Sequence, residues 1–319
     1  MPQVTLQIIN GGTVMEPLTE NDIQVTLEKR GAAGRIDFTV IENGEMDFEL
    51  GNTVKLLIDG ALFFYGFVFE KSNSKDGKTS VTAYDQLRYL IHNKFSYIFE
   101  DKTADEIIKV IATDYLLNLG TIDGTDYPFE SYTCENKTLM DTISEVLDRT
   151  YDETGNEFIL FDDGAGKLSL RHHDDMKTTV FVDATQGEDY SYESSIDKDT
   201  YNDVVLVHQD TEEIAEAHDQ NNISKWGLLR LLETVTDTTE TVQTRAAQLL
   251  EIYNRPSKKL SVSSVFGNST VRGGSLVTVN LKTAAETINQ TMGVYSVTHV
   301  FQNDRHIMNL TLEGGEFSA

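Results

Sequence analysis

The sequence predicts an α+β fold that is mainly β, with two similar β-barrel domains and an α+β insert between them. Strand patterns dominate up to residue 85 and again from residue 258, whereas helical patterns are concentrated between these regions. The two β regions also share a spacing of strands and glycines. A chain of 319 residues is long enough to form two or three hydrophobic cores.

The first β region is organised around a predicted hairpin at 53–69. Asp59 and Gly60 are the residue types that a tight two-residue turn requires. Gly66 interrupts the returning strand, and a glycine there favours a bulge or bend that curls a sheet toward a barrel. A coiled sandwich sheet is the alternative, and this stretch does not decide between them. Further strands are predicted at 4–9, 23–27, 35–41 and 80–84.

The returning strand of the hairpin is apolar on both faces. Phe63, Tyr65 and Phe67 lie on one face, and Phe64 and Val68 lie on the other. One face can fill a core, and the other needs a cover. We therefore expect Phe63, Tyr65 and Phe67 to contribute to an interface.

Helix signals follow this β region. Thr103 and Glu106 have capping-box spacing, and Thr138 marks a second helix start. Apolar residues recur at helical spacing after each start. A hairpin is predicted at 157–172. Residues 96–178 are therefore predicted to form the α+β insert.

The remaining residues are predicted to form the second β-barrel domain. We place the first barrel domain at 1–95 and the second at 179–319, with possible strand exchange between them. A helix is expected at 242–253, and the polar stretch 211–222 is expected to be a mobile loop.

An internal repeat supports the prediction of two similar domains. The spacing from Gly66 to Val81 equals the spacing from Gly293 to Met308, and each of the two glycines belongs to a strand pattern. Repeated spacing of this kind indicates a duplicated supersecondary unit, although strand–turn–strand units readily resemble one another.

The composition excludes several classes of partner. The chain has 26 Lys and Arg against 52 Asp and Glu, a net charge of −26, so we expect no tight binding of nucleic acid. No apolar stretch approaches the ~20 residues that span a bilayer, and the start of the chain lacks a secretion signal, so stable membrane insertion is not expected. Cys134 is the single cysteine and is interpreted as a structural thiol, so an intrachain disulfide is impossible.

The sequence contains no strong catalytic or cofactor motif. HExxH, GxGxxG, GxxxxGK[ST] and GxSxG are all absent. His172 and His173 are followed by two aspartates, but neighbouring residues of a strand point to opposite faces. The stretch 162–164 lacks the spacing of a calcium loop. We therefore predict no catalytic residue, no cofactor and no metal site.

Trp226 is the only tryptophan and lies in the sequence NISKWGLL. Tryptophan is enriched at anchoring positions of protein interfaces, so Trp226 is a candidate for a subunit or partner contact. Local packing against a strand is the alternative.

Several blocks of the chain resemble the XkdQ/YqbQ-type proteins of phage-like tail particles. These blocks are GNTVKLLIDGALFFYGFVFEKS, TAYDQLRYL, YIFEDKTADEIIKVIATDY, TYNDVVLV, NISKWGLL, RAAQLLEIYNRPS and YSVTHVFQNDRHIMNLTLEGG. The resemblance implies a baseplate hub of a contractile tail or a bacteriocin-like particle, a virion structural protein with tube-type barrels. It implies a homotrimer that adapts a hexameric tail tube to a threefold spike and contacts other baseplate proteins. Its location would be the tail of a particle assembled in the bacterial cytoplasm.

Two other functions stay open at this stage. A tail protein could be a carboxylate-dependent hydrolase of cell-wall glycan, since the many acidic residues offer numerous carboxylate pairs. It could also be a glycan-binding tail protein. We favour the interpretation that the protein is a structural hub and not an enzyme.

Overall fold

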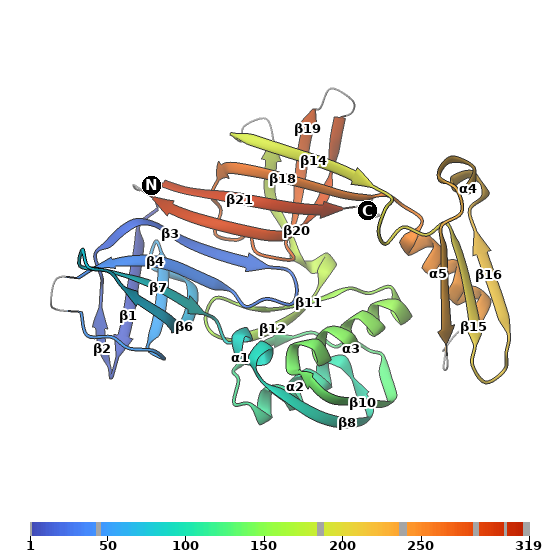
Figure 1. Cartoon of the computed structure of the whole chain (residues 1–319), viewed down its shortest axis with the longest axis horizontal. Coiled ribbons are helices and arrows are strands. Elements are labelled where there is room, and N and C mark those ends of the chain that lie inside the picture. Colours follow the sequence, from blue (N-terminus) through green and yellow to red (C-terminus); the bar gives the residue numbers. More distant parts are fainter. Residues whose placement is uncertain are drawn as a thin grey trace.

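The computed structural model describes residues 2–42, 46–183, 188–235, 241–282, 287–302 and 305–314. A long sheet extends across the molecule, the insert lies beneath it, and a small unit is attached at the far end from β2 (Thr13–Met15) (Figure 1). The fold is mainly β with antiparallel sheets, as the sequence predicted. No helix of the described ranges has both the length and the apolar character that crossing a membrane requires.

The first β region contains the predicted hairpin, which β5 (Thr53–Ile58) and β6 (Ala61–Asn73) form. Asp59 and Gly60 have φ values of 51° and 78°, so both turn residues have the positive φ that the tight turn needs. The core of this region is formed by the inward side chains of the strands and by Phe301 from the end of the chain. Besides β2, β5 and β6, its strands are β1 (Val4–Asn10), β3 (Thr19–Glu28), β4 (Arg35–Ile41) and β7 (Lys78–Tyr84).

Gly66 lies between two bulges of β6. The pairing with β5 shifts at Phe63 and the pairing with β7 shifts at Phe69. These shifts break the predicted alternation, so both Phe63 and Phe64 are buried. A Cβ at Gly66 would lie 2.4 Å from the carbonyl oxygen of Tyr84, so the strands approach too closely for a side chain.

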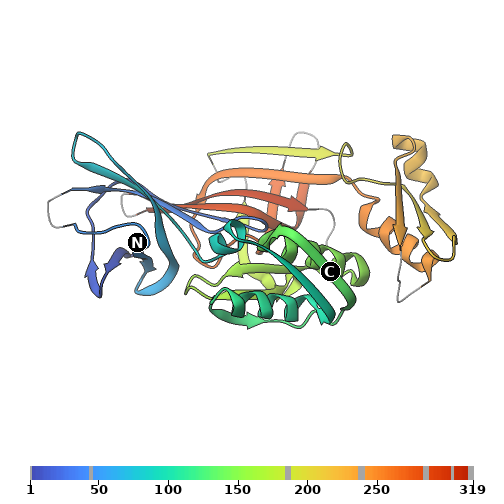
Figure 2. The ribbon, with the colours of Figure 1, turned by 60° about the horizontal axis from the view of Figure 1, so that its bottom comes forward.

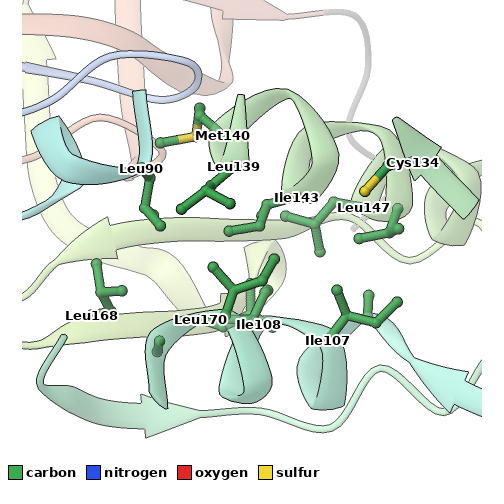
Figure 3. Packing of buried hydrophobic residues seen from close by; sticks show 14 of the residues in the cluster. Leu90, Ile107, Ile108, Cys134, Leu139, Met140, Ile143, Leu147, Leu168 and Leu170 are labelled. Atoms are coloured by element: carbon green, nitrogen blue, oxygen red, sulfur yellow. The ribbon is translucent and has the colours of Figure 1, made fainter. Parts of the chain in front are cut away.

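The insert forms a core between three helices and two small sheets. Thr103 and Glu106 form the predicted capping box, and the Thr138 hydroxyl accepts a hydrogen bond from the Asp141 amide at 3.0 Å. Leucines and isoleucines of the helices pack against Leu170 (Figure 3). The elements are α1 (Leu87–His92), β8 (Lys94–Thr103), α2 (Ala104–Asp114), β9 (Leu119–Ile122), β10 (Pro128–Thr138), α3 (Leu139–Thr154), β11 (Phe158–Asp162) and β12 (Leu168–His172).

The second β region repeats the strand order of the first. In the first region the hydrogen-bonded order is β3-β4-β7-β6-β5-β1, and in the second it is β14-β18-β21-β20-β19-β13. The first five strands of each series pair in antiparallel fashion; the last pair differs, because β13 is parallel to β19. The elements are η1 (His173–Met176), β13 (Lys177–Asp183), β14 (Asp189–Ser195), β18 (Ser257–Phe266), β19 (Leu276–Lys282), β20 (Thr287–Gln302) and β21 (Arg305–Gly314).

Backbone contacts align the two regions residue by residue. Gly51 and Gly274 both have φ of 86° and precede β5 and β19. The Gly51 amide donates to the Val68 carbonyl at 2.8 Å, and the Gly274 amide donates to the Val294 carbonyl at 2.7 Å. A one-residue shift follows directly in both regions, at Phe69 and at the residue after Val294. Val68 is therefore equivalent to Val294.

This alignment corrects the predicted repeat. Gly293 is equivalent to Phe67 and not to Gly66, and Val81 is equivalent to Leu310, because Val68 and Val294 hold the same backbone contacts. The topology is repeated, but the equal spacing of Gly66–Val81 and Gly293–Met308 is a coincidence, because these pairs are not at equivalent positions.

The two regions share one continuous sheet. The first part of β20 pairs with β19, and its second part pairs with β3, from Ser296 opposite Glu28 to Phe301 opposite Ile23. Within the described residues, the series of paired strands ends at β14 on one side and at β2 on the other, and these two end strands do not pair with each other. The chain alone therefore forms an open sheet there and not the closed barrels that the sequence led us to expect.

A small unit between β14 and β18 has its own core, which the sequence analysis did not separate from the second region. Its sheet has the order β16-β15-β17, and α5 covers one face. The predicted loop at 211–222 is wrong, because it contains β16 and the start of α4. The elements are β15 (Asp203–His208), β16 (Ile214–His218), α4 (Gln220–Trp226), β17 (Arg230–Val235) and α5 (Val242–Tyr253).

We predict that Gly66→Ala lowers the free energy of unfolding by about 1–3 kcal/mol, because the new Cβ collides with the backbone of β7. Urea denaturation measures the change. Gly124→Ala is the matched control, since the nearest atom to its added Cβ is 3.6 Å away. Equal unfolding midpoints for the two variants would show that β6 and β7 can separate at no cost.

Candidate functional site

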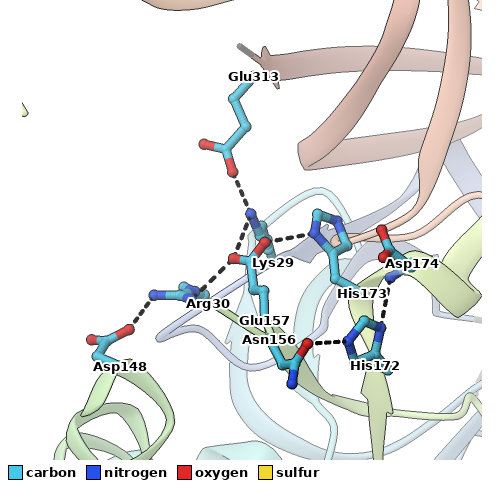
Figure 4. A network of polar contacts seen from close by, with 9 residues as sticks. All are labelled: Lys29, Arg30, Asp148, Asn156, Glu157, His172, His173, Asp174 and Glu313. Atoms are coloured by element: carbon cyan, nitrogen blue, oxygen red, sulfur yellow. Dashed lines mark hydrogen bonds and ion pairs between the residues drawn. The ribbon is translucent and has the colours of Figure 1, made fainter. Parts of the chain in front are cut away.

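The insert meets both β regions at a buried ionic cluster (Figure 4). The Lys29 ammonium, at the end of β3, lies 3.0 Å from Glu157 and 2.7 Å from Glu313 of β21. The Lys29 side chain is 8% exposed, so its charge depends on these partners. One lysine thus connects three regions that are far apart in sequence.

Glu157 is the centre of this cluster. His173 Nδ1 lies 2.6 Å from one Glu157 oxygen, and the Arg30 guanidinium lies 3.0 Å from the other. Arg30 also pairs with Asp148 of α3. Burial opposes ionisation of Glu157, but the hydrogen bond to His173 and the charge of Lys29 outweigh it and hold the pKa of Glu157 below its usual range.

A second buried cluster fixes the turn between β11 and β12. One Asp162 oxygen accepts the amides of Gly164 at 2.9 Å and Gly166 at 3.2 Å, and the other accepts the Gln86 amide at 3.1 Å. The Arg272 guanidinium donates to the Asp162 carbonyl at 2.6 Å. Arg272 precedes β19, so this turn is anchored to the second β region.

Asp85 faces the same cluster with both oxygens occupied. They accept the Gly34 amide at 2.8 Å and the Leu87 amide at 3.0 Å. Burial raises the pKa of Asp85, and the nearby Asp162 charge adds to the effect; burial also raises the pKa of Asp162 to about 6. Both carboxyls are enclosed by backbone donors, so this pair is not placed to meet a glycan.

A cleft of about 560 Å³ opens beside the first cluster. Its walls come from Lys29 and Arg30, from α3, from the end of α5 and from the start of β18. Asp152 lies in this wall, and burial raises its pKa to about 6. Both basic and acidic side chains line the cleft, so it does not define the charge of a ligand.

The predicted interface aromatics lie in different environments. Phe63 is buried, with its ring centroid 4.9 Å from that of His299 in β20. Tyr65 and Phe67 are half-buried and contact each other edge to face at 5.7 Å. Tyr65 packs against Gly166 of the insert, so the chain itself covers part of this stripe.

Trp226 ends α4 in the small unit and is half-buried. Leu228 and Leu232 of the same unit are 56% and 66% exposed. Trp226 belongs to α4, which lies at the opposite end of the molecule from β6 and its aromatic residues (Figure 1). The four predicted interface residues do not form one patch.

The pair His172 and His173 diverges. The His172 ring packs edge to face on Phe158, whereas His173 contacts Glu157. A different polar group lies in the small unit, where carboxylate oxygens of Asp203 and Glu216 and a ring nitrogen of His218 lie within 4.8 Å of one another. The Arg230 guanidinium occupies this group, because it pairs with both carboxylates.

Lys29, Glu157 and Arg272 were not among the residues predicted from the sequence. Each is an ordinary charged residue at the end of a strand or in a loop, and its partner is distant in sequence. A lysine directly after a strand and a glutamate directly before another were visible, but nothing in the sequence paired them.

Comparisons with known proteins agree with this architecture. The model of the family described as YQBQ-like matches residues 23–313. The phage-like element PBSX protein XkdQ of Bacillus subtilis is 31% identical over 82% of this chain and 80% of its own, and the uncharacterized protein YqbQ of the same strain is 30% identical over the same shares. The crystal structure of a tail protein from Neisseria meningitidis superposes with a TM-score of 0.72 at 14% identity, covering 98% of this chain and 96% of that one.

The chain, with its repeated strand series, thus shares the fold of this tail protein. The family model matches residues 23–313, so the comparison shows family membership as well as fold. The chain belongs to the YQBQ-like family.

We predict that Glu157→Gln destabilises the fold by about 3 kcal/mol, because it leaves the buried Lys29 charge with one partner fewer. Chemical denaturation at neutral pH measures the change. Asp148→Asn serves as control and should cost less than about 1 kcal/mol, since Asp148 and Arg30 are 53% and 40% exposed. Similar costs for both variants would contradict a central role for Glu157.

We predict that the cost of Asp162→Asn is smaller at pH 8 than at pH 5. Because the pKa of Asp162 is raised from 3.8 to about 6, its contribution is fully present below 3.8 and is lost as pH rises through about 6. The asparagine side chain does not ionise, so only the wild type loses stability in this window. Thermal unfolding of both proteins between pH 5 and 8 tests the sign, and a cost that grows with pH would refute it.

Proposed function

We propose that the protein is a structural hub at the tip of a phage tail or tail-like particle. Three copies would form a ring that connects a hexameric tail tube to a threefold spike. The observation that carries this proposal is the repeated strand order, β3-β4-β7-β6-β5 and β14-β18-β21-β20-β19, within one chain.

Symmetry explains why a duplicated unit suits this role. A trimer in which every chain contributes two similar units presents six similar units around its axis. Such a ring matches a sixfold partner on one side while keeping threefold symmetry for the other. We infer two tube-type domains on this basis, with the boundaries 1–95 and 179–319 and the insert at 96–178 between them.

The family supports a role in the tail and in contacts with other baseplate proteins. A relative that is 31% identical is described as a protein of the phage-like element PBSX. The location that follows is the tail of a virion or tail-like particle, after assembly in the bacterial cytoplasm. The net charge of −26 suits a ring through which nucleic acid passes without adhering.

A structural role, rather than catalysis, fits the side chains that the structure brings together. The carboxylates of Asp162 and Glu157 are held by backbone amides and buried cations. These contacts connect regions of the chain to one another. We accordingly propose that the protein is not an enzyme.

We predict that the full chain, alone or mixed with its tube and spike proteins, has the mass of an assembly with three copies. Native mass spectrometry and light scattering measure this, and a cell-wall gel assay of the same sample should show no clearing. Only monomers in every mixture would refute the hub. Clearing that is lost on replacing one Asp or Glu would favour the hydrolase instead.

The predicted contact at Trp226 has its own test. Trp226→Ala should weaken association with a copy or a partner while leaving the unfolding midpoint nearly unchanged, because the side chain is only half-buried. A variant that unfolds earlier but assembles normally would assign Trp226 to local packing.

A further inference from the structure

The junction between the two β regions shows how β20, the strand equivalent to β6, accepts a second partner strand. Beyond Val294, β20 pairs with β21 on one side and with β3 on the other. Ser296 to Phe301 form this ladder, and the Thr26 and Thr298 hydroxyls meet across it at 3.1 Å. β3 is the first strand of its own series, so its outer edge is what β20 binds.

The equivalent place on β6 is open. After Val68, β6 pairs with β7, and no strand of the described ranges pairs with the other side of Glu70 to Asn73. The Ser74 amide donates to the Lys78 carbonyl, so Ser72 faces β7 in the alternating antiparallel pattern. The backbone groups of Lys71 and Asn73 consequently face the open side.

A groove of about 750 Å³ lies at this open edge. It is lined by residues 48–50 and 69–73 and by two outward residues of β7. Val297 and His299, the equivalents of Lys71 and Asn73, are 0% exposed, whereas Lys71 and Asn73 are exposed. β3 pairs with the β20 ladder, whereas no strand of the described ranges pairs with this part of β6, where Lys71 contacts Phe48 of the preceding loop.

β14 supplies the matching edge. It is the first strand of the second series, as β3 is of the first, and the strand order ends at β14. Six strands separate β14 from β6 in the sheet, and among the described residues the two edges do not pair with each other. A second copy of the chain can join them.

We propose that the β14 edge of one copy pairs in antiparallel fashion with residues 70–73 of β6 in the next copy. The proposal rests on the trimeric hub proposed above and specifies its contact. Three such contacts alternate with the three internal β3–β20 ladders and close a ring of six. Unpaired edges of this kind readily accept a further strand.

The internal ladder fixes the register of the contact. Through the pairings with β4 and β18, Val25 is equivalent to Tyr192 and Thr26 to Glu193. Since Thr26 lies opposite Thr298, and Ser72 is equivalent to Thr298, Glu193 should lie opposite Ser72.

The remaining pairs follow by counting along the strands. Lys71 is then opposite Ser194, and Asn73 is opposite Tyr192. Leu50 occupies the position that Gly273 has in the internal ladder, where a Cβ would lie 2.2 Å from Glu28, so the two junctions differ at this end.

Disulfide trapping in the full chain tests this register. Ser72→Cys with Glu193→Cys places thiols at a directly opposed pair, where Cβ atoms approach within about 5 Å. Oxidation of the three-copy assembly should give covalent dimers and trimers on a non-reducing gel, and a reductant should remove them. The buried Cys134 is present in every sample and contributes equally.

Two matched variants frame the result. Ser72→Cys with Ser194→Cys shifts one thiol to the opposite face and should give about tenfold less covalent trimer. Thr26→Cys with Thr298→Cys should cross-link within one chain, because that ladder is internal, and it verifies the oxidation conditions.

The outcomes separate the two proposals. A three-copy assembly without cross-links between positions 72 and 193, or with equal cross-linking in the shifted variant, would overturn the strand contact and leave the hub intact. Absence of any three-copy assembly would refute the hub itself. Covalent trimer that is specific to the predicted register supports both.

Discussion

The pairing of β3 with the second half of β20 is the constraint on which the architecture depends. It joins the beginning of the chain to its end, and residues such as Thr26 and Thr298 that meet there are 272 positions apart. Closing so large a loop costs conformational entropy, which the six-residue ladder and the burial of Val25, Val297 and Phe301 against neighbouring cores must offset. The long sheet in Figures 1 and 2 therefore depends on contacts between distant parts of the chain as well as on hairpins between neighbouring strands.

The insert is held against this sheet by charges rather than by apolar contact alone. Lys29, Glu157 and Glu313 form one attachment, and Asp162 with Arg272 forms another. Their pH dependences have opposite signs. The pKa of Glu157 is lowered, so Glu157 stabilises the fold at pH values above its ordinary pKa of 4.5 and loses this contribution as pH falls. The pKa of Asp162 is raised, so Asp162 stabilises the fold in its protonated form. The Glu157 contribution changes only as pH falls below 4.5, whereas the Asp162 contribution changes between 3.8 and about 6, so the two clusters respond to pH in adjoining ranges.

Local chemistry made part of this structure predictable. The Asp59-Gly60 turn, the caps at Thr103 and Thr138 and the helix of Val242–Tyr253 each depend on a few adjacent residues. β16 was missed because alanines at 215 and 217 form its buried face, and small side chains give a weak alternation. The ionic clusters and the β3–β20 ladder could not be found, since a charge or a strand edge does not reveal a partner that is more than a hundred residues away.

The duplication also explains why the family can be recognised without a catalytic motif. A repeated sheet needs glycines where strands or turns crowd, as at Gly51 and Gly274, and apolar residues on alternating positions, but it tolerates many side chains elsewhere. A 14% identical tail protein therefore superposes over nearly the whole chain. The duplication does constrain the edges, because among the described residues the outer edge of β14 and the open side of Glu70 to Asn73 in β6 have no partner strand. A chain with two such complementary edges either adds copies until a ring closes or exposes an edge on which further chains can add without limit. The proposed closure at three copies would pair both of these edges in every chain.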